Sequence, residues 1–216
     1  YNKSERWNMF IEKLNSTFRK NEPIFTEEIL SAFSQYSRPR VFQFINKAEG
    51  NGELVRFDTG VYYLPIVTEF GRSKITAEQV AEKKYVKYGN KIFGIYGRLV
   101  LELNFLLSTQ VPNTIEIITN NEARRVREVL IGNRPFILRK ARCPIDSGNY
   151  GAYTIMELFS NMDMRQYQES EYARKEIIKY MNKERITSKD LFSLASSFPA
   201  RTTKNIVESG VLNDIA

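Results

Sequence analysis

The chain has 216 residues and a mass of 25.2 kDa, which corresponds to one large domain or two small ones. Hydrophobic residues make up 42% and charged residues 26%, values of a globular protein, so a disordered or fibrous chain is excluded. The sequence contains no histidine and a single cysteine, Cys143. These counts exclude histidine-dependent nucleophiles, zinc sites of the HExxH type and intramolecular disulfides.

The sequence carries no motif for a bound cofactor or metal. Neither a P-loop nor a GxGxxG pattern occurs among its 11 glycines. No apolar run reaches membrane-spanning length, and no signal-peptide pattern is present. We therefore expect a cytoplasmic protein with no cofactor, no metal and no membrane partner, and one that is not an enzyme.

Positive charge is concentrated in the middle of the chain. The formal net charge is +7 and the isoelectric point about 9.4. Residues 66–147 hold 14 lysines and arginines against 8 acidic residues. Such an excess fits a solvated face or a surface for a polyanion such as nucleic acid, and the sequence leaves both open. The candidate basic surface comprises Lys83, Lys84, Lys87, Arg124, Arg125, Arg127, Arg139 and Arg142.

The first 65 residues predict three helices. Residues 4–20 carry an apolar stripe at helical spacing, in which Trp7, Phe10 and Leu14 recur. Thr26 is expected to cap a second, shorter helix. Ser37 is expected to cap a third, which runs to about Glu49 and ends at Gly50.

A β-hairpin is predicted directly after the third helix. Two short β-type runs, residues 53–57 and 61–64, flank the turn Asp58-Thr59-Gly60. Three helices followed by a hairpin is the order of a winged helix-turn-helix module. We assign residues 1–66 to such a DNA-binding domain.

Residues 67–216 predict a larger mixed α+β domain that ends in helices. The expected elements are helices at 75–88, 98–107 and 153–161, strands at 114–119, 126–131 and 135–141, and final helices near 168–182, 188–196 and 200–209. The fold class is therefore α+β.

The third helix carries the residues that point to DNA recognition. A helical wheel places Val41, Phe44, Ile45 and Ala48 on one face, and we assign Arg40, Gln43 and Lys47 to the opposite face. Arginine and glutamine can each make two hydrogen bonds to a base edge, and lysine can bind phosphate. The candidate DNA-binding residues are Ser37, Arg38, Arg40, Gln43, Lys47 and Arg56.

Two other classes of function stay open at this point. Winged helices also serve as protein-interaction modules, and the low net charge of the first 65 residues is compatible with that role. Glu116 alternates with isoleucines on a predicted strand, as carboxylates do in some metal-dependent nucleases. No Asp/Glu-x-Lys follows it, which favours a paired or strand-edge carboxylate over a catalytic one.

Three segments in sequence order resemble the AbiEi-type antitoxins of the AbiE abortive-infection, type IV toxin–antitoxin systems of bacteria. The first segment is Gly60-Val61-Tyr62-Tyr63-Leu64-Pro65, at the end of the predicted hairpin. The second runs from Gly97 to Pro112, and the third comprises residues 115–120 together with residues 131–139. The resemblance covers about residues 8–160.

The resemblance implies two activities for the chain. The N-terminal domain would bind inverted repeats in its operator DNA and repress its own operon, using the six residues named above. The C-terminal domain, which is not catalytic, would counteract a toxin of the nucleotidyltransferase class. In this family the two proteins need not form a stable complex, so direct contact with the toxin is not assumed.

Overall fold

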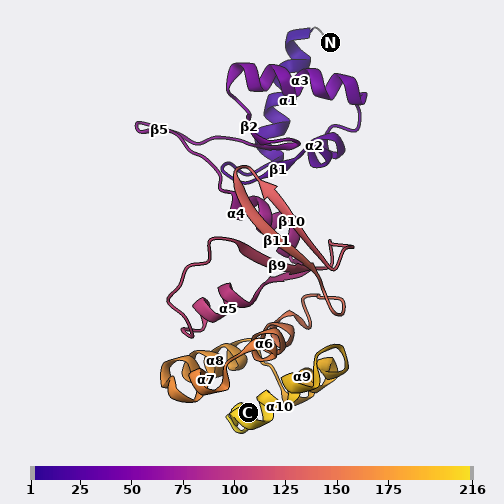
Figure 1. The fold of residues 1–216 in the computed structure, drawn as a ribbon. Coiled ribbons are helices and arrows are strands. Elements are labelled where there is room, and N and C mark those ends of the chain that lie inside the picture. The colour runs from indigo at the N-terminus through magenta and orange to yellow at the C-terminus, as the bar shows by residue number, and fades with distance from the viewer. Residues whose placement is uncertain (1–2, 215–216) are drawn as a thin grey trace. The chain divides into compact units, whose positions relative to one another are not determined.

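The computed structural model describes residues 3–214 as a mixed α+β protein that divides into two compact units (Figure 1). The first unit comprises the chain up to Lys83 together with Ile131–Asn133. The second comprises Lys84–Leu130 and the chain from Arg134 onward. Residues 67–83 thus group with the first unit, whereas the sequence prediction assigns them to the second domain. No helix in the described part of the chain is long and apolar enough to cross a membrane.

The first unit is built on three helices and a small sheet. The helices are α1 (Lys3–Thr17), α2 (Thr26–Ala32) and α3 (Arg38–Asn51). Strand β3 (Val61–Tyr63) lies between β1 (Ile24–Phe25) and β2 (Val55–Asp58) and is antiparallel to both. The predicted hairpin is therefore confirmed, and its turn contains Gly60 in the left-handed region at φ 73°.

Aromatic side chains join the helices of the first unit. The ring of Phe10 on α1 lies 4.4 Å from that of Phe33 and 4.9 Å from that of Phe44, measured between centroids. All three rings are buried. The predicted apolar faces of the first and third helices are thus confirmed, and they account for the packing of these helices.

Two predicted helix ends in the first unit differ from the structure. Thr26 is the first helical residue and not the cap, and its hydroxyl donates a hydrogen bond to the Gly60 carbonyl at 3.2 Å. The third helix continues through Gly50 and ends at Gly52, because Gly52 is the residue in the left-handed conformation, at φ 72°.

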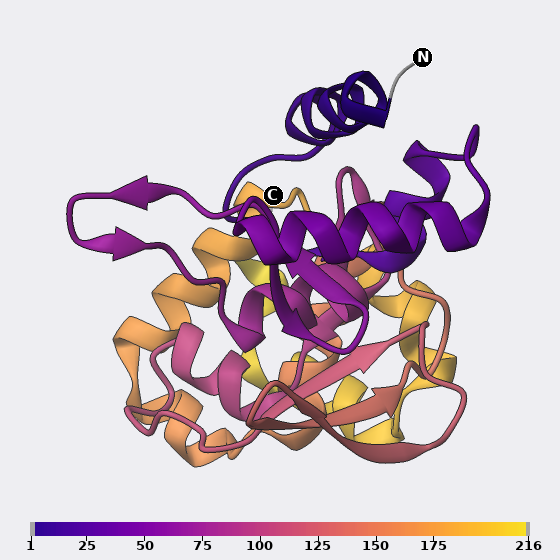
Figure 2. The same cartoon turned by 90° about the horizontal axis from the view of Figure 1, so that it is seen from above.

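Two short elements follow the hairpin. Strands β4 (Val67–Thr68) and β5 (Gly71–Arg72) form a two-stranded ribbon that stands away from α3 in both views (Figures 1 and 2). Helix α4 (Ala77–Ala81) is capped by Thr76, whose hydroxyl accepts a hydrogen bond from the Gln79 amide. The helix predicted over residues 75–88 is confirmed over residues 77–86, but its second half is π-helical. A π-helical turn (Glu82–Val86) follows α4, and the chain then enters strand β6.

The second unit contains a four-stranded sheet in the order β10-β11-β9-β8. Strand β9 (Ile115–Thr119) runs parallel to β11 (Arg134–Lys140) and antiparallel to β8 (Gly94–Tyr96). Strand β10 (Val126–Ile131) forms the edge beside β11. The three strands predicted between residues 114 and 141 are thus confirmed. Strands β6 (Lys87–Tyr88) and β7 (Lys91–Ile92) form a separate two-stranded ribbon.

Helix α6 (Tyr150–Asn161) is the central helix of the second unit. Every residue from Gly151 to Ser160 is buried, which agrees with its almost wholly apolar sequence. Its neighbours in the apolar core include α5 (Arg98–Asn104), α8 (Glu171–Lys183), α9 (Ser188–Leu194) and α10 (Ala200–Ser209). The shorter elements of this end are α7 (Met164–Glu169) and the 3-10 turns Ala195–Ser197 and Val211–Asn213.

Candidate nucleic-acid interface and a basic pocket

Helix α3 presents a polar surface on the side away from the core of the first unit. Its buried residues are Val41, Phe44, Ile45 and Ala48, as the helical wheel predicts. Its exposed side chains are Arg38, Pro39, Gln43, Asn46, Lys47 and Asn51. The helix therefore carries one arginine, one lysine and three amide side chains on a continuous solvent-facing strip.

Arg40 lies at the border of this strip and not on its centre. Its guanidinium carbon is 4.5 Å from the centroid of the Phe44 ring, and the side chain is half-buried. Its Nη1 donates a hydrogen bond to Gln43 Oε1 at 2.8 Å. The wheel angle explains the difference, because position 40 falls only 40° from position 44. The structure thus joins Arg40 and Gln43 into one hydrogen-bonded pair.

Lys47 and Arg38 are held at opposite ends of the strip. The Lys47 ammonium lies 4.2 Å above the Trp7 ring on α1, within the range of a cation–π contact. Arg38 Nη2 lies 3.3 Å from Glu27 Oε1, and both side chains are more than half exposed. An exposed pair of this kind contributes little to stability, so Arg38 can exchange its partner for a phosphate.

Ser37 and Arg56 complete the set of predicted residues. Ser37 is the N-cap residue of α3, as predicted, but its side chain makes no capping hydrogen bond. Arg56 on β2 is exposed and lies opposite Tyr62 of β3. Asp58 at the end of β2 accepts a hydrogen bond from the Thr59 amide at 2.6 Å, which shapes the turn.

The sequence argument did not include Asn46. Its exposed side chain lies one helical turn beyond Gln43, where an amide can reach a base edge as glutamine can. Its position three residues after Gln43, on the same side of the helix, was the sequence feature that could have identified it.

Lys83 does not belong to an exposed basic surface. Its ammonium lies 2.8 Å from Glu28 Oε2 and 2.6 Å from the Pro23 carbonyl oxygen, and its side chain is 15% exposed. The charge is neutralised inside the first unit, so this residue is a structural one. Lys84 and Lys87 are exposed, as the prediction requires.

Two candidate basic residues of the second unit form ion pairs with nearby carboxylates. Arg127 Nε lies 2.7 Å from Glu122 Oε2, and Arg139 forms an ion pair with Glu116. The interpretation of Glu116 as a paired carboxylate is therefore confirmed. Glu122 is buried, and the hydrogen bond donated by the backbone N–H of Arg124 lowers the pKa of its carboxyl group. Among the described residues, no group of three or more acidic or cysteine side chains could hold a metal ion.

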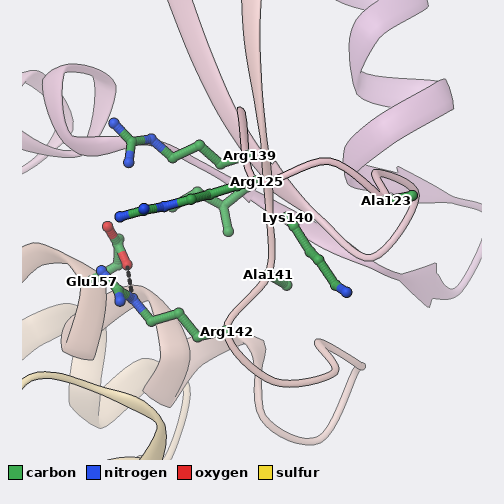
Figure 3. A pocket seen from close by; sticks show the side chains of 8 residues that line it. Ala123, Arg125, Arg139, Lys140, Ala141, Arg142 and Glu157 are labelled. Atoms are coloured by element: carbon green, nitrogen blue, oxygen red, sulfur yellow. Dashed lines mark ion pairs between the residues drawn. The ribbon is translucent and has the colours of Figure 1, made fainter. Parts of the chain in front are cut away.

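Three of these arginines surround a pocket of about 450 Å³ between the sheet and α6 (Figure 3). Arg125 precedes β10, Arg139 lies on β11, and Arg142 follows β11. Figure 3 shows the side chains of Arg125 and Arg142 extending toward Glu157 and that of Arg139 lying above them, whereas that of Lys140 points the other way. Arg139 and Lys140 diverge because successive residues of a strand face opposite sides of the sheet.

Glu157 is a charged residue buried in the central helix. Its side chain is 7% exposed, and its Oε2 lies 3.5 Å from Arg142 Nε. Burial raises the pKa of this carboxyl group, and Arg142 opposes the effect. The sequence analysis missed this residue, although a lone glutamate within the apolar run of residues 150–160 was a signal that could have identified it.

We expect Glu157→Gln to raise the free energy of unfolding at pH 7 by about 1 kcal/mol, because the variant no longer buries an incompletely hydrogen-bonded charge. A raised pKa means that the native state holds the proton more tightly than the unfolded state. The contribution of Glu157 to stability is therefore greatest below its ordinary pKa of 4.5 and is lost as the pH rises through the raised value. Urea denaturation followed by circular dichroism should show the variant's advantage shrinking from pH 7 to pH 4.

The matched control is Glu208→Gln on α10, where the carboxylate is 52% exposed. This control should leave the pH dependence of stability unchanged. A Glu157→Gln variant that is less stable than the parent at pH 7 would contradict the assignment of Glu157 as a destabilising buried charge.

The comparisons with known proteins assign no family. No protein-family model matches the chain, and no curated protein sequence matches it. The functional argument therefore depends on the residues and contacts described above.

Proposed function

We propose that the chain is a sequence-specific DNA-binding regulator whose first unit is a winged helix-turn-helix, with α3 as the recognition helix. The observation that carries this proposal is the exposed strip of α3. It places Gln43 and Asn46 between the cationic side chains of Arg38 and Lys47 on a helix whose other side is fully packed. Amides that can read bases, flanked by cations that can bind phosphates, are what a helix in the major groove requires.

The hairpin after α3 supports the same proposal. Strands β2 and β3 follow the helix within a few residues, and β3 pairs with β1 on its other side, as a wing does in this class of module. Arg56 is exposed on β2 and can bind a phosphate. The turn carries Asp58, so we expect the strand and not the tip of the wing to approach the DNA backbone.

Replacement of Arg40 by alanine is expected to weaken binding to the preferred DNA by about 1–3 kcal/mol and to relax its specificity. The substitution removes a donor that can read guanine, and it removes the hydrogen bond that orients Gln43. Fluorescence anisotropy with labelled operator and scrambled duplexes measures both effects. Arg174→Ala, on the exposed surface of α8, is the control. Equal losses on the two duplexes would contradict base reading by Arg40.

Lys47→Ala is expected to weaken binding to all sequences alike, because lysine is assigned to a phosphate. A variant that makes one phosphate contact fewer releases about one counterion fewer when it binds DNA. The slope of log K against log salt concentration should therefore become shallower by about one unit. Titrations at four salt concentrations measure this slope. Lys204→Ala, on α10, should leave it unchanged, and an unaltered slope for Lys47→Ala would contradict the phosphate contact.

We extend the proposal to autoregulation and to an antitoxin activity of the second unit. The support for this extension is the sequence resemblance to AbiEi-type antitoxins. The third segment that carries it, residues 115–120 together with residues 131–139, includes β9 and most of β11, which pair in one sheet. The extension makes the chain a repressor of its own operon, a cytoplasmic protein without enzymatic activity, and the antagonist of a nucleotidyltransferase-type toxin.

Co-expression tests the antitoxin activity. The neighbouring gene product should arrest the growth of a bacterial host, and the full chain should restore growth without necessarily being retained by the toxin in a pull-down. Failure to restore growth would refute the antitoxin activity and leave DNA binding intact. Cleavage of plasmid DNA by the chain in the presence of Mg²⁺ or Mn²⁺ would instead identify it as a nuclease.

A further inference from the structure

The pocket in the second unit is lined by an arginine that no carboxylate of the described residues pairs with. Arg139 is paired with Glu116, and Arg142 lies at ion-pair distance from Glu157. Arg125 lines the same pocket, and its guanidinium has no ion pair or side-chain hydrogen bond with any residue in the described part of the chain. The lining holds four cationic side chains, those of Arg125, Arg139, Lys140 and Arg142, and one carboxylate, that of Glu157, which leaves a site for an additional anion.

One carboxylate of the pocket also lacks a hydrogen bond. Glu157 Oε2 is buried and accepts none from the residues that the structure describes, although Arg142 Nε is 3.5 Å away. A buried carboxylate oxygen without a donor is costly, and a ligand hydroxyl or amino group could satisfy it. The pocket therefore offers donors for an anion on one side and an acceptor for a ligand O–H or N–H on the other.

We propose that this pocket binds a ribonucleoside phosphate, with its phosphate on Arg125, Arg139 and Arg142 and a ribose hydroxyl donating to Glu157. A guanidinium group can donate two parallel hydrogen bonds to phosphate oxygens. In many nucleotide-binding sites a carboxylate accepts a hydrogen bond from a ribose hydroxyl. Ile118, Ala123 and Ala141 are the apolar residues of the lining, which a base could contact. The cavity, at about 450 Å³, is within the range of small-molecule sites.

Isothermal titration calorimetry of the full chain tests the proposal. The probes are the four ribonucleoside 5′-triphosphates, their 2′,3′-dideoxy counterparts, inorganic phosphate and a short RNA. We expect at least one ribonucleotide to bind and its dideoxy form to bind about tenfold more weakly, since one hydrogen bond to a charged group is lost. Absence of binding by every nucleotide at millimolar concentration, or binding of the RNA alone, would overturn the proposal.

Substitutions locate the ligand. Arg125→Gln should weaken nucleotide binding about tenfold or more. Its side chain is exposed, so we expect the variant to fold, which circular dichroism checks. Lys204→Gln removes the same charge from an exposed side chain on α10, outside the lining of the pocket, and should leave the affinity unchanged. Equal effects of the two variants would show nonspecific electrostatic binding and overturn the proposal.

Glu157→Met identifies the second contact. The variant should lose the preference for ribonucleotides over dideoxynucleotides, because methionine fills a similar volume without a strong acceptor. It should retain binding of the triphosphate through the arginines. A preference that survives in Glu157→Met would overturn the assignment of the ribose to Glu157. None of these outcomes depends on DNA binding by α3.

Discussion

Phe44→Ala is expected to lower the free energy of unfolding of the first unit by about 3–5 kcal/mol. The Phe44 ring is 4% exposed and lies within 6.2 Å, between centroids, of the rings of Trp7, Phe10 and Tyr36. Its removal creates a cavity at the contact between α1 and α3, and it also removes the ring beneath the Arg40 guanidinium. A large loss is expected because the neighbouring rings cannot all close the cavity.

Trp7 provides a direct measurement of this effect. It is the single tryptophan of the chain and lies in the first unit, so its fluorescence during urea denaturation reports the unfolding of that unit. The control is Phe192→Ala on α9, where the ring is 46% exposed and belongs to the second unit. The control should leave the Trp7 transition unchanged. A loss below 1 kcal/mol for Phe44→Ala would show that Phe44 is not central to this core.

Lys83→Met should lower the stability of the first unit by about 3 kcal/mol, since removal of one partner of a buried ion pair leaves the other charge uncompensated. Lys83 and Glu28 are 15% and 18% exposed at their side chains, and the ammonium contacts both carboxylate oxygens of Glu28 within 2.9 Å. In this variant Glu28 would lose the Lys83 ammonium and would keep its other partners, among them the Phe25 amide at 2.8 Å. The Trp7 transition again measures the loss.

A double-mutant cycle separates the ion pair from other effects. Adding Glu28→Gln to Lys83→Met removes the uncompensated charge, so the double variant should be less destabilised than the two single losses together predict. Lys84→Met changes the next residue, which is exposed, and should have little effect. Additive losses in the double variant would contradict a direct interaction between Lys83 and Glu28.

The packing of the first unit could be predicted because it follows local periodicity. The apolar stripes of α1 and α3 and the glycine turn between β2 and β3 are visible in the sequence, and the structure confirms them. The end of α3 was misplaced by two residues because Gly50 and Gly52 are equally good candidates by composition. Only the backbone shows that Gly52 takes the left-handed conformation.

The candidate sites depended on contacts between distant residues, which sequence patterns do not record. In the sequence Lys83 belongs to a cluster of basic residues. In the structure it is paired with Glu28, which lies 55 positions earlier in the chain. The sequence shows only that Glu157 belongs to a helix. The arginines that line the pocket beside it come from segments before and after the hairpin β10–β11. Charge counts therefore could not separate paired cations such as Lys83 from unmatched ones such as Arg125.

DNA binding by the full chain is the measurement that tests the central claim most directly. Its affinity for the DNA upstream of its own gene is compared with that for a scrambled duplex of equal composition, at two salt concentrations, for the parent chain and for Gln43→Ala/Asn46→Ala. We predict a preference for the upstream DNA, an affinity that falls steeply with salt, and loss of the preference in the double variant. Equal affinity of the parent chain for both duplexes, or no binding to either, would contradict recognition of DNA by α3.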